Sequence, residues 1–350
     1  EIHERVAHAL SDVGLSGFAA RNVERLSAGQ KHRLAIASVL SMHPQILLLD
    51  EPASQLDCAG KSELVETLKN LKAQGYTLII AEHHLEPFEK LADRFVHMDC
   101  GRIIEISQGI PPEFAPPPTA APGVSGRAPE KSNAAPAVCA QGLALAHPGV
   151  GNILSGFDLT VRQGECIHLK GRNGCGKSSL LAAMAGALHP AKGTIFINGQ
   201  NSAGKKSLFG TVGYLMQNPQ RQLFENTVFE EVAFSLKRLR LPATDIERRV
   251  FEALEICEAD HLTDRLPLAL SFGEQHRVAL ASVLAPRPSV LLLDEPFAGL
   301  DFHQRRRLLS ILSRLREKYA TTILMASHDD LPDRNWADRV IPVDRDAASS

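Results

Sequence analysis

The spacing of apolar residues along the chain alternates between two periods, one typical of strands and the other of helices. Residues 138–170 alternate apolar with polar positions and break at two turns, so we expect short strands that form a small β layer. Residues 165–170, 194–197 and 321–327 are further predicted strands. The run 289–293 is short, largely apolar and followed by two acids, which predicts a buried strand of a parallel sheet.

Helical spacing of apolar residues appears in several longer stretches. It is present in residues 1–15 and again in residues 245–257, and the run 179–188 is rich in Ala and Leu. Residues 228–239 form a further amphipathic segment, which by default packs on a core but would also suit a surface that faces a partner. Residues 244–247, Thr-Asp-Ile-Glu, have the spacing of a capping box, so a helix is expected to restart there.

A domain-sized repeat links the two ends of the chain. The motifs are LSAGQ at 26–30, HR at 32–33, ILLLDEP at 46–52 and LD at 56–57, and they return in the same order as LSFGE at 270–274, HR at 276–277, VLLLDEP at 290–296 and LD at 300–301. The period far exceeds that of a solenoid, so it predicts two copies of one domain.

The two predicted domains occupy residues 1–107 and 138–346, and residues 108–137 join them. The joining stretch is rich in Pro, Ala, Gly and Ser and poor in large apolar residues, so we expect an extended or disordered linker. The second copy carries a glycine-rich loop well before its helix at 245–257, whereas the first copy opens inside the matching helix. We therefore expect a further segment, with the first copy's own loop, to precede Glu1.

Residues 171–179, GRNGCGKSS, fit the phosphate-loop pattern G-x-x-x-x-G-K-[ST]. A predicted strand precedes them and a predicted helix follows, which is the setting that the pattern requires. Glycines allow backbone N–H groups to turn inward around a polyphosphate, and the start of the helix adds its positive dipole end. We expect Lys177 to reach the β- and γ-phosphates and Ser178 to bind Mg²⁺, with a chance glycine-rich turn as the alternative.

Acids and other polar residues follow the predicted strands of the second copy. Asp294 and Glu295 come directly after the run 289–293, and ligands of open α/β sheets bind beyond the carboxyl ends of the strands. We expect Asp294 to hold Mg²⁺ through water and Glu295 to activate the attacking water, unless the two acids only cap the next helix. His328 is expected at the same edge, and Gln217 near Mg²⁺ or the water, although a glutamine there is more often a loop residue.

Composition narrows the class of protein. The chain has 350 residues, a net charge of −2 and an apolar fraction of 44%, which suit two globular domains and give no general reason to expect nucleic-acid binding. The six cysteines are scattered without a CxxC pair, which fits a reduced compartment and not a metal site. No stretch approaches the roughly 18 apolar residues of a membrane helix, so any action at a membrane would be that of a peripheral subunit.

Taken together, these motifs resemble those of the ATP-binding cassette family. The resemblance covers the chain except the linker, and it implies the α/β P-loop NTPase fold of ABC ATPases with two tandem cassettes, the first incomplete. Each cassette would have a mainly parallel sheet, a helical subdomain and a small β layer. The resemblance also implies that two cassettes pack head to tail, with each ATP between the phosphate loop of one and the signature helix of the other.

Two composite ATP sites follow from the resemblance. One site would take its ATP-binding residues from both copies, namely Gly171, Asn173, Gly174, Cys175, Gly176, Lys177, Ser178 and Ser179 with Ser27, Gly29 and Gln30. Its catalytic residues would be Glu295, His328, Gln217 and Lys177. Its Mg²⁺ ligands would be Ser178, Gln217 and Asp294. The second composite site would use Asp50, Glu51 and His83 with Ser271 and Gly273, and Asp57 and Asp301 would lie in the two D-loops.

Three residues depart from the family pattern. Phe272 and Glu274 replace the usual Gly and Gln of the second signature motif, and the added carboxylate is expected to weaken ATP binding there. His147 stands where an aromatic residue often stacks on adenine.

Residues 217–224, QNPQRQLF, and 227–234, TVFEEVAF, resemble the ATPase components of energy-coupling-factor importers. The second glutamine and the Leu-Phe pair of the first run are its more discriminating part. This resemblance implies an ATP hydrolase that uses ATP and Mg²⁺ and powers uptake of a vitamin, cobalt or nickel through closure of an intramolecular cassette dimer. Its partners would be a transmembrane coupling subunit and a substrate-binding membrane subunit, without nucleic acid, at the cytoplasmic side of the cell membrane.

Other functions remain open on the sequence. The chain could be the tandem ATPase of another importer, a soluble twin-cassette ATPase that acts on ribosomes or nucleic acid, or a nucleotide-binding scaffold that does not hydrolyse ATP. The Pro/Ala-rich linker argues against the ribosomal class, which tends to carry a charged helical connector. The presence of Lys177, Asp294, Glu295 and His328 argues against the scaffold.

Overall fold

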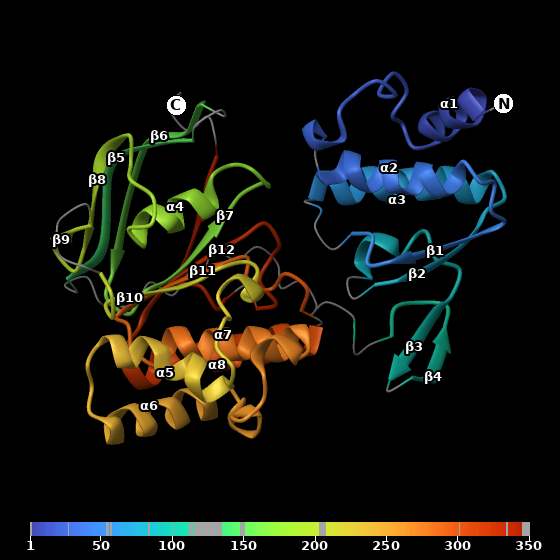
Figure 1. Ribbon diagram of the computed structural model, residues 1–350. Coiled ribbons are helices and arrows are strands. Elements are labelled where there is room, and N and C mark those ends of the chain that lie inside the picture. The colour runs from blue at the N-terminus through green and yellow to red at the C-terminus, as the bar shows by residue number, and fades with distance from the viewer. Residues whose placement is uncertain are drawn as a thin grey trace. The chain divides into compact units, whose positions relative to one another are not determined.

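The computed structural model describes residues 2–26, 28–53, 56, 58–82, 85–99, 101–111, 114, 135–147, 151–202, 208–300, 302–333 and 335–344. They fall into two compact units, which divide between Ala121 and Pro122. Each unit has its own sheets and its own buried apolar cluster (Figure 1).

Among the described residues of the second unit, a five-stranded parallel sheet forms the centre. Its strands are, in spatial order, β10 (Val212–Leu215), β11 (Val290–Asp294), β12 (Thr322–Ser327), β7 (Cys166–Lys170) and β13 (Arg339–Pro342). Val290 and Leu292 of β11 belong to one apolar cluster and Leu291 and Leu293 to the other, because successive side chains point to opposite faces. Both faces of this sheet are therefore buried, as is usual for parallel sheets.

A second sheet and one helix cover the first face. The sheet is antiparallel in the order β6 (Gly151–Arg162), β5 (Pro136–His147), β8 (Lys192–Ile197) and β9 (Gln200–Asn201). β5 thus begins within the stretch expected as a linker. Helix α4 (Lys177–Met184) adds Leu180, Leu181 and Met184 to the same cluster. The helix ends before the predicted residue 188 because Gly186 adopts a left-handed φ of 75°.

Longer helices cover the opposite face of the parallel sheet. They are α5 (Val228–Arg238), α6 (Ala243–Ile256), α7 (Phe272–Leu284) and α8 (Phe302–Tyr319), with short 3-10 turns η3 (Pro219–Arg221), η4 (Asp260–Leu262) and η5 (Pro267–Ala269). Figure 1 shows α5 to α8 on one side of the sheet and α4 on the other. Within the described ranges of the chain, no helix is both long and apolar enough to span a membrane.

The start of α6 differs from the prediction, and the capping box expected at residues 244–247 is wrong. Pro242 precedes the first turn, and its carbonyl oxygen accepts hydrogen bonds from the N–H groups of Asp245 and Ile246, both at 3.0 Å. Thr244 consequently lies inside the first turn, too late to cap it. The fixed φ of proline suits the start of a helix, so Pro242 decides the boundary.

The first unit repeats part of this plan. Its helices are α1 (Ile2–Asp12), α2 (Ala28–Leu40) and α3 (Cys58–Ala73), with short 3-10 turns η1 (Val23–Arg25) and η2 (Glu86–Phe88). Strands β1 (Ile46–Asp50) and β2 (Thr77–Ala81) pair in parallel. Strands β3 (Phe95–Asp99) and β4 (Arg102–Ser107) form a separate antiparallel pair. By motif order, α2, β1, α3 and β2 are the counterparts of α7, β11, α8 and β12.

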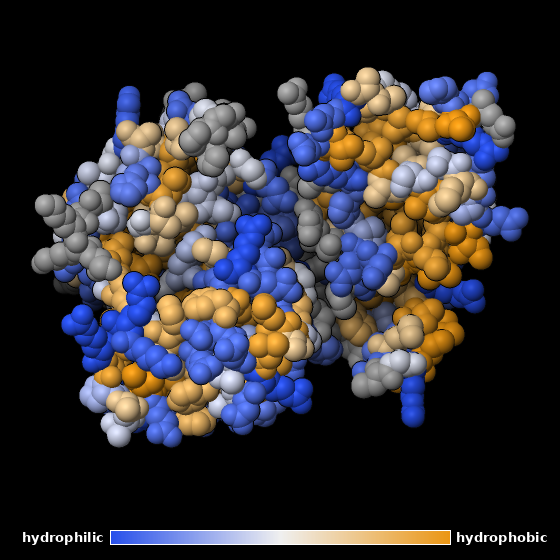
Figure 2. Space-filling model, in the orientation of Figure 1, coloured by the Kyte–Doolittle hydropathy of each residue, from blue (hydrophilic) through white to orange (hydrophobic). Residues whose placement is uncertain are grey.

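One face of the β1–β2 sheet is open to solvent. Leu48 is 74% exposed, and Ile79, which lies opposite it in the ladder, is 56% exposed. The matching residues of the second unit, Leu292 and Leu324, are both 0% exposed, because they pack in the cluster that α4 and the antiparallel sheet complete. The described part of the first unit contains no counterpart of these covering elements. Figure 2 shows apolar side chains gathered at the surface over the strands of the first unit.

Because this face is exposed in the first unit and buried in the second, we expect the same Leu→Ala change to lower the unfolding free energy by different amounts in the two units. Leu292→Ala is expected to lower the unfolding free energy of the second unit by about 2–5 kcal/mol, because it leaves a cavity in a closed core. Leu48→Ala is expected to change that of the first unit by only about 0.5 kcal/mol. Urea unfolding followed by the fluorescence of Trp336, the one tryptophan of the chain, measures the second unit, and amide hydrogen exchange measures the first. Equal losses in the two variants would contradict the open face.

Candidate functional site

The carboxyl ends of four strands meet at one edge of the parallel sheet. β7, β10, β11 and β12 run in the same direction and are paired in register through β11 and β12. The segments that follow them are the loop 171–176, Gln217, Glu295 and His328. Side chains far apart in the sequence are thereby brought to the edge at which α/β sheets bind their ligands.

The loop 171–176 needs glycine at two positions where its backbone passes close to other atoms. A Cβ at Gly171 would lie 2.3 Å from the carbonyl oxygen of Val343. At Gly176, where φ is +106°, a Cβ would lie 2.6 Å from Ile153 Cγ2. Gly176 is also the residue before the first turn of α4, so the loop leads directly to that helix start. The tight backbone and the positive end of α4 together form a cradle suited to phosphate.

Lys177 turns back over the loop toward Glu295. Its Nζ donates hydrogen bonds to the carbonyl oxygens of Gly171 (2.8 Å) and Arg172 (3.1 Å). Nζ also lies 3.2 Å from Glu295 Oε1, and both side chains are almost fully buried. An unpaired charge in such a position would be strongly destabilising, so the two charges stabilise each other.

Ser178 and Asp294 join α4 to the end of β11. Ser178 Oγ donates to Asp294 Oδ1 over 2.9 Å, and the hydroxyl of Tyr214 on β10 bonds to the same carboxylate. Burial raises the pKa of Asp294, although the hydroxyl groups of Ser178 and Tyr214 oppose that rise. A hydroxyl beside a carboxylate provides oxygen ligands of the kind that Mg²⁺ takes from proteins, with phosphate and water completing its shell.

Glu295 has a backbone conformation that few residues other than glycine adopt. Its φ is 45°, and its N–H donates to the carbonyl oxygen of Ala326 on β12 over 2.9 Å. Such a residue costs about 1–3 kcal/mol and persists only where its surroundings hold it, often in active sites. The next helix, α8, begins only at Phe302, so the alternative that the two acids cap it is excluded.

The carboxylate of Glu295 is held from two sides. Its Oε2 lies 2.9 Å from His328 Nδ1 and accepts the backbone N–H of His328 over 3.3 Å, while its Oε1 faces Lys177. Burial would raise the pKa of Glu295, but the hydrogen bond from His328 and the charge of Lys177 bring that pKa below its ordinary value. Glu295 is therefore ionised at neutral pH, as a proton acceptor must be.

Gln217 is exposed at this edge, and the loop that carries it is held by Gln222. Gln222 Oε1 accepts the N–H of Met216 over 2.8 Å, and its Nε2 donates to the carbonyl oxygen of Tyr214 over 2.9 Å. Sequence reasoning missed Gln222 and Tyr214 as site residues. Period-two alternation places Tyr214 on the same face as Asp294, but only the pairing of β10 with β11 makes them neighbours.

The first unit reproduces the acid-bearing half of this arrangement. Asp50 ends β1, and Glu51 has a left-handed φ of 43° with its N–H bonded to the carbonyl oxygen of Ala81 over 2.9 Å. Gly29 and Gln30 lie in the first turn of α2. Ser27, Asp57, His83 and Asp301 lie outside the described residues, as does the side chain of His147.

Ser271 stands before the first turn of α7, and Glu274 binds it. Glu274 Oε2 accepts the backbone N–H of Ser271 over 2.9 Å and its Oγ hydrogen over 2.6 Å, which lowers the pKa of Glu274. Gly273 faces Gln304, since a Cβ there would lie 2.8 Å from Gln304 Nε2. The Ser271 hydroxyl, which the family resemblance assigns to ATP binding, thus donates its hydrogen to the Glu274 carboxylate.

The contribution of Glu295 to stability should depend on pH. Its folded-state pKa is lower than the ordinary value of 4.5, so its ionised form stabilises the folded state above pH 4.5, and this contribution disappears as the pH falls through the lower folded-state pKa. We expect the stability advantage of the wild type over Glu295→Gln to shrink accordingly in acid. Urea unfolding of both proteins, followed by Trp336 fluorescence from about pH 3 to 7, measures it. A difference independent of pH would contradict the assigned ion pair.

Most of this chain is similar in sequence to proteins of a known family. The profile described as ABC transporter matches residues 1–54 and 154–298. A putative ABC transporter ATP-binding protein of Methanosarcina acetivorans is 34% identical over 97% of this chain, and one of Bifidobacterium longum is 34% identical over the same 97%. The chain spans 65% of the first relative and 50% of the second.

Two solved structures have a similar fold. The structure of cbiO1 from Clostridium perfringens, part of the ABC transporter complex cbiONQ, is 32% identical with a TM-score of 0.56, covering 60% of this chain and 85% of that one. The ATP-binding cassette MJ0796, a dimer bound to ADP and Pi, is 23% identical with a TM-score of 0.55 over 59% of this chain and 94% of its own, a likeness of fold alone. With its phosphate loop, parallel sheet and paired acids, this chain belongs to the ABC transporter family of ATP-binding proteins and has the P-loop fold of ABC ATPases.

Proposed function

We propose that this protein binds and hydrolyses ATP at the carboxyl edge of the parallel sheet in its second unit. The observation that carries the proposal is the joined set of contacts in which Lys177 and His328 hold Glu295 beside the Ser178–Asp294 pair. A phosphate cradle, two oxygen ligands for Mg²⁺ and a buried ionised carboxylate are the parts that attack of water on a γ-phosphate requires.

Lys177 and Glu295 would exchange partners in the reaction. With a triphosphate in the loop, Lys177 Nζ binds phosphate oxygens in place of the carbonyl oxygens and Glu295. Glu295 then keeps His328 as its partner and is free to accept a proton from water. Ser178 and Asp294 would hold the Mg²⁺ ion, which neutralises phosphate charge when bound. Gln217, exposed at the same edge, is assigned to Mg²⁺ or to the attacking water.

The first unit is proposed to complete this site through head-to-tail closure of two cassettes. Ser27, Gly29 and Gln30 at the start of α2 would meet the γ-phosphate that the second unit holds. Two features support a second cassette. The strained acid recurs at Glu51, and Leu48 and Ile79 on the exposed β1–β2 face match residues that α4 and its neighbouring sheet cover in the second unit.

The reciprocal site is proposed to bind ATP more weakly. It would use Asp50, Glu51 and His83 of the first unit with Ser271 and Gly273 of the second. Glu274 already accepts the hydroxyl hydrogen of Ser271, and its negative charge would oppose a triphosphate at the same helix start. The two composite sites would therefore differ in activity.

We propose that ATP hydrolysis by this protein powers an importer of the energy-coupling-factor type, which takes up a vitamin, cobalt or nickel. The run 217–224 and the similarity to cbiO1 support this class. The partners would be a transmembrane coupling subunit and a substrate-binding membrane subunit, which places the protein at the cytoplasmic side of the cell membrane as a peripheral subunit.

Replacement of the proposed base tests the reaction. In the full-length protein, Glu295→Gln is expected to lower ATP turnover by about 10²–10⁴-fold while ATP stays bound, because the amide cannot accept the proton of the attacking water. Lys177→Ala is expected to weaken ATP binding itself. Phosphate release and binding of a fluorescent ATP analogue measure the two effects.

The matched control is Glu255→Gln, which alters an exposed acid of α6 outside the site and is expected to retain full turnover. Trp336 fluorescence in urea checks that each variant is folded. Undiminished hydrolysis by Glu295→Gln would refute the assignment of the base.

Isolation from membranes tests the proposed partners. The full-length protein, extracted from its native membranes in mild detergent, is expected to bring a transmembrane coupling subunit and a substrate-binding membrane subunit with it, which mass spectrometry identifies. Recovery with ribosomal proteins or nucleic acid instead would favour the soluble twin-cassette alternative.

A further inference from the structure

A buried arginine, Arg305, lies near the start of α8. It is only 7% exposed, whereas the next two residues, Arg306 and Arg307, are exposed. A guanidinium is always charged and carries five N–H donors, so its burial is costly unless neighbouring groups match it. One match is the carbonyl oxygen of Leu300, which accepts a hydrogen bond from Arg305 Nε over 2.9 Å. Its other contacts lie beside the candidate site.

The guanidinium of Arg305 contacts two segments that leave the carboxyl edge of the parallel sheet. In the segment after Glu295, the centre of the buried Phe297 ring lies 5.9 Å from the guanidinium carbon. In the segment after His328, Asp329 Oδ2 lies 3.5 Å from Arg305 Nη1. Arg305 thus joins the segment that carries the proposed base to the segment that carries its partner.

The carboxylate of Asp329 also faces the ring of His328. Asp329 Oδ1 lies 3.5 Å from His328 Nε2, while the other ring nitrogen, Nδ1, lies 2.9 Å from Glu295 Oε2. The imidazole therefore lies between two carboxylates, Glu295 on the side of the site and Asp329 on the side of Arg305. The positive charge of Arg305 offsets that of Asp329, which leaves the imidazole to serve Glu295.

The first copy of the domain lacks the residues that make these contacts. All three members of the set differ there by motif order: Ala53 replaces Phe297, Lys61 replaces Arg305 and His84 replaces Asp329. A lysine and a histidine cannot form an ion pair with each other. Even so, β1, β2 and α3 form, and Glu51 has a left-handed φ of 43°, close to the 45° of Glu295. The fold and the conformation of the acid therefore do not require the arginine.

We propose that Arg305 is a positioning residue for ATP hydrolysis, because it fixes the segment after Glu295 against the segment after His328. This inference rests on the proposed function. Arg305 acts through Asp329 and through the backbone of Leu300, and it is not a catalytic residue. The phosphate loop binds ATP from another part of the edge, so loss of the arginine should slow turnover without weakening ATP binding.

Substitution of Arg305 in the full-length protein tests this role. Arg305→Gln is expected to lower kcat by about tenfold and to change KM for ATP by less than about twofold, because only the reacting arrangement is disturbed. Arg305→Lys keeps a positive charge beside Asp329, so kcat should stay within about threefold of the wild type. Arg305→Lys together with Asp329→His gives the residues of the first copy, and kcat should again fall by about tenfold. Phosphate release at varied ATP concentration measures both constants.

A double-mutant cycle separates positioning from a general loss of structure. Asp329→Asn alone is expected to lower kcat by about tenfold, and Arg305→Gln with Asp329→Asn should be no slower than either single variant by more than about twofold, since both changes remove one contact. Trp336 fluorescence in urea checks that each variant is folded, and Arg305→Lys keeps the test decisive if Arg305→Gln unfolds.

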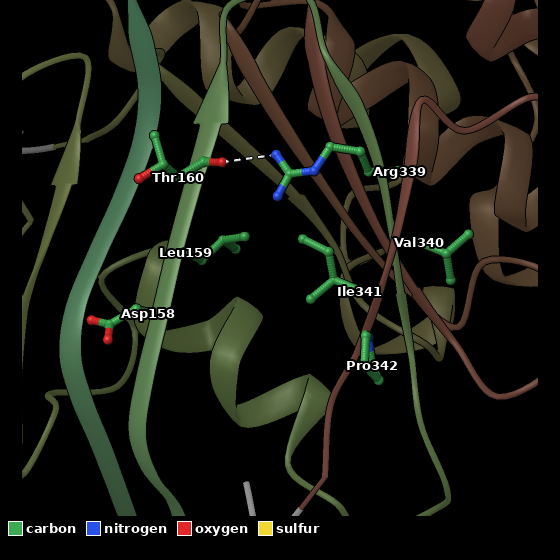
Figure 3. Close-up of a pocket in the computed structure, with 7 residues that line it drawn as sticks. All are labelled: Asp158, Leu159, Thr160, Arg339, Val340, Ile341 and Pro342. Carbon is green, nitrogen blue, oxygen red and sulfur yellow. Dashed lines mark hydrogen bonds between the residues drawn. The ribbon is translucent and has the colours of Figure 1, made fainter. Parts of the chain in front are cut away.

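The matched control is Arg339→Gln on β13. Arg339 Nη1 likewise donates to a backbone carbonyl oxygen, that of Thr160, over 3.1 Å and lies 3.0 Å from the carboxylate of Glu165. Figure 3 shows this guanidinium reaching from β13 toward Thr160 on β6. Arg339 lies opposite Ile167, near the start of β7 and away from the carboxyl edge, so kcat is expected to stay within about twofold of the wild type.

The outcomes distinguish this inference from the proposed function. Full turnover by Arg305→Gln beside an inactive Glu295→Gln would overturn the role of Arg305 alone, whereas full turnover by both variants would overturn the proposed function as well. Equal losses in Arg305→Lys and Arg305→Gln, additive effects in the cycle, or an equal loss in Arg339→Gln would each overturn the positioning role. Weaker ATP binding at unchanged kcat would do so too.

Discussion

The candidate site depends on the buried ion pair between Lys177 and Glu295. Two charges removed from water must be matched closely, and Lys177 Nζ lies 3.2 Å from Glu295 Oε1. The loop before Lys177 turns through glycines that pass within contact distance of Val343 and Ile153, and Glu295 takes a left-handed φ. These backbone conformations bring the two charges together, and the proposed reaction would replace Glu295 by phosphate as the partner of Lys177.

The duplication shows which part of the fold creates that strain. Glu51 and Glu295 share a left-handed backbone and the same hydrogen bond to the neighbouring strand, although the described part of the first unit contains no phosphate loop. The conformation of the acid therefore follows from the strand pair and the turn after it, and not from the lysine. Lys177 uses a carboxylate that the sheet has already oriented.

The two units also differ in which apolar side chains are buried by neighbouring elements. Leu48 and Leu292 occupy the same place in the same strand motif, yet one is exposed and the other fully buried. Likewise, β3 pairs with β4, whereas within the described residues β13 pairs with β7 alone. Because apolar surface gains free energy when it is covered, the exposed β1–β2 face lacks a stabilising contribution that the second unit has.

The sequence by itself determined the buried strands, the phosphate loop and the order of the acids, because these depend on local spacing and on the known direction of parallel strands. It did not determine where α6 begins, since Pro242 outweighed the Thr-x-x-Glu pattern. Only the tertiary structure decided that Tyr214 meets Asp294 and that Lys177 meets Glu295. These contacts join residues that are distant in the chain, so they depend on strand register and on packing. Neither strand register nor packing can be predicted from a local sequence pattern.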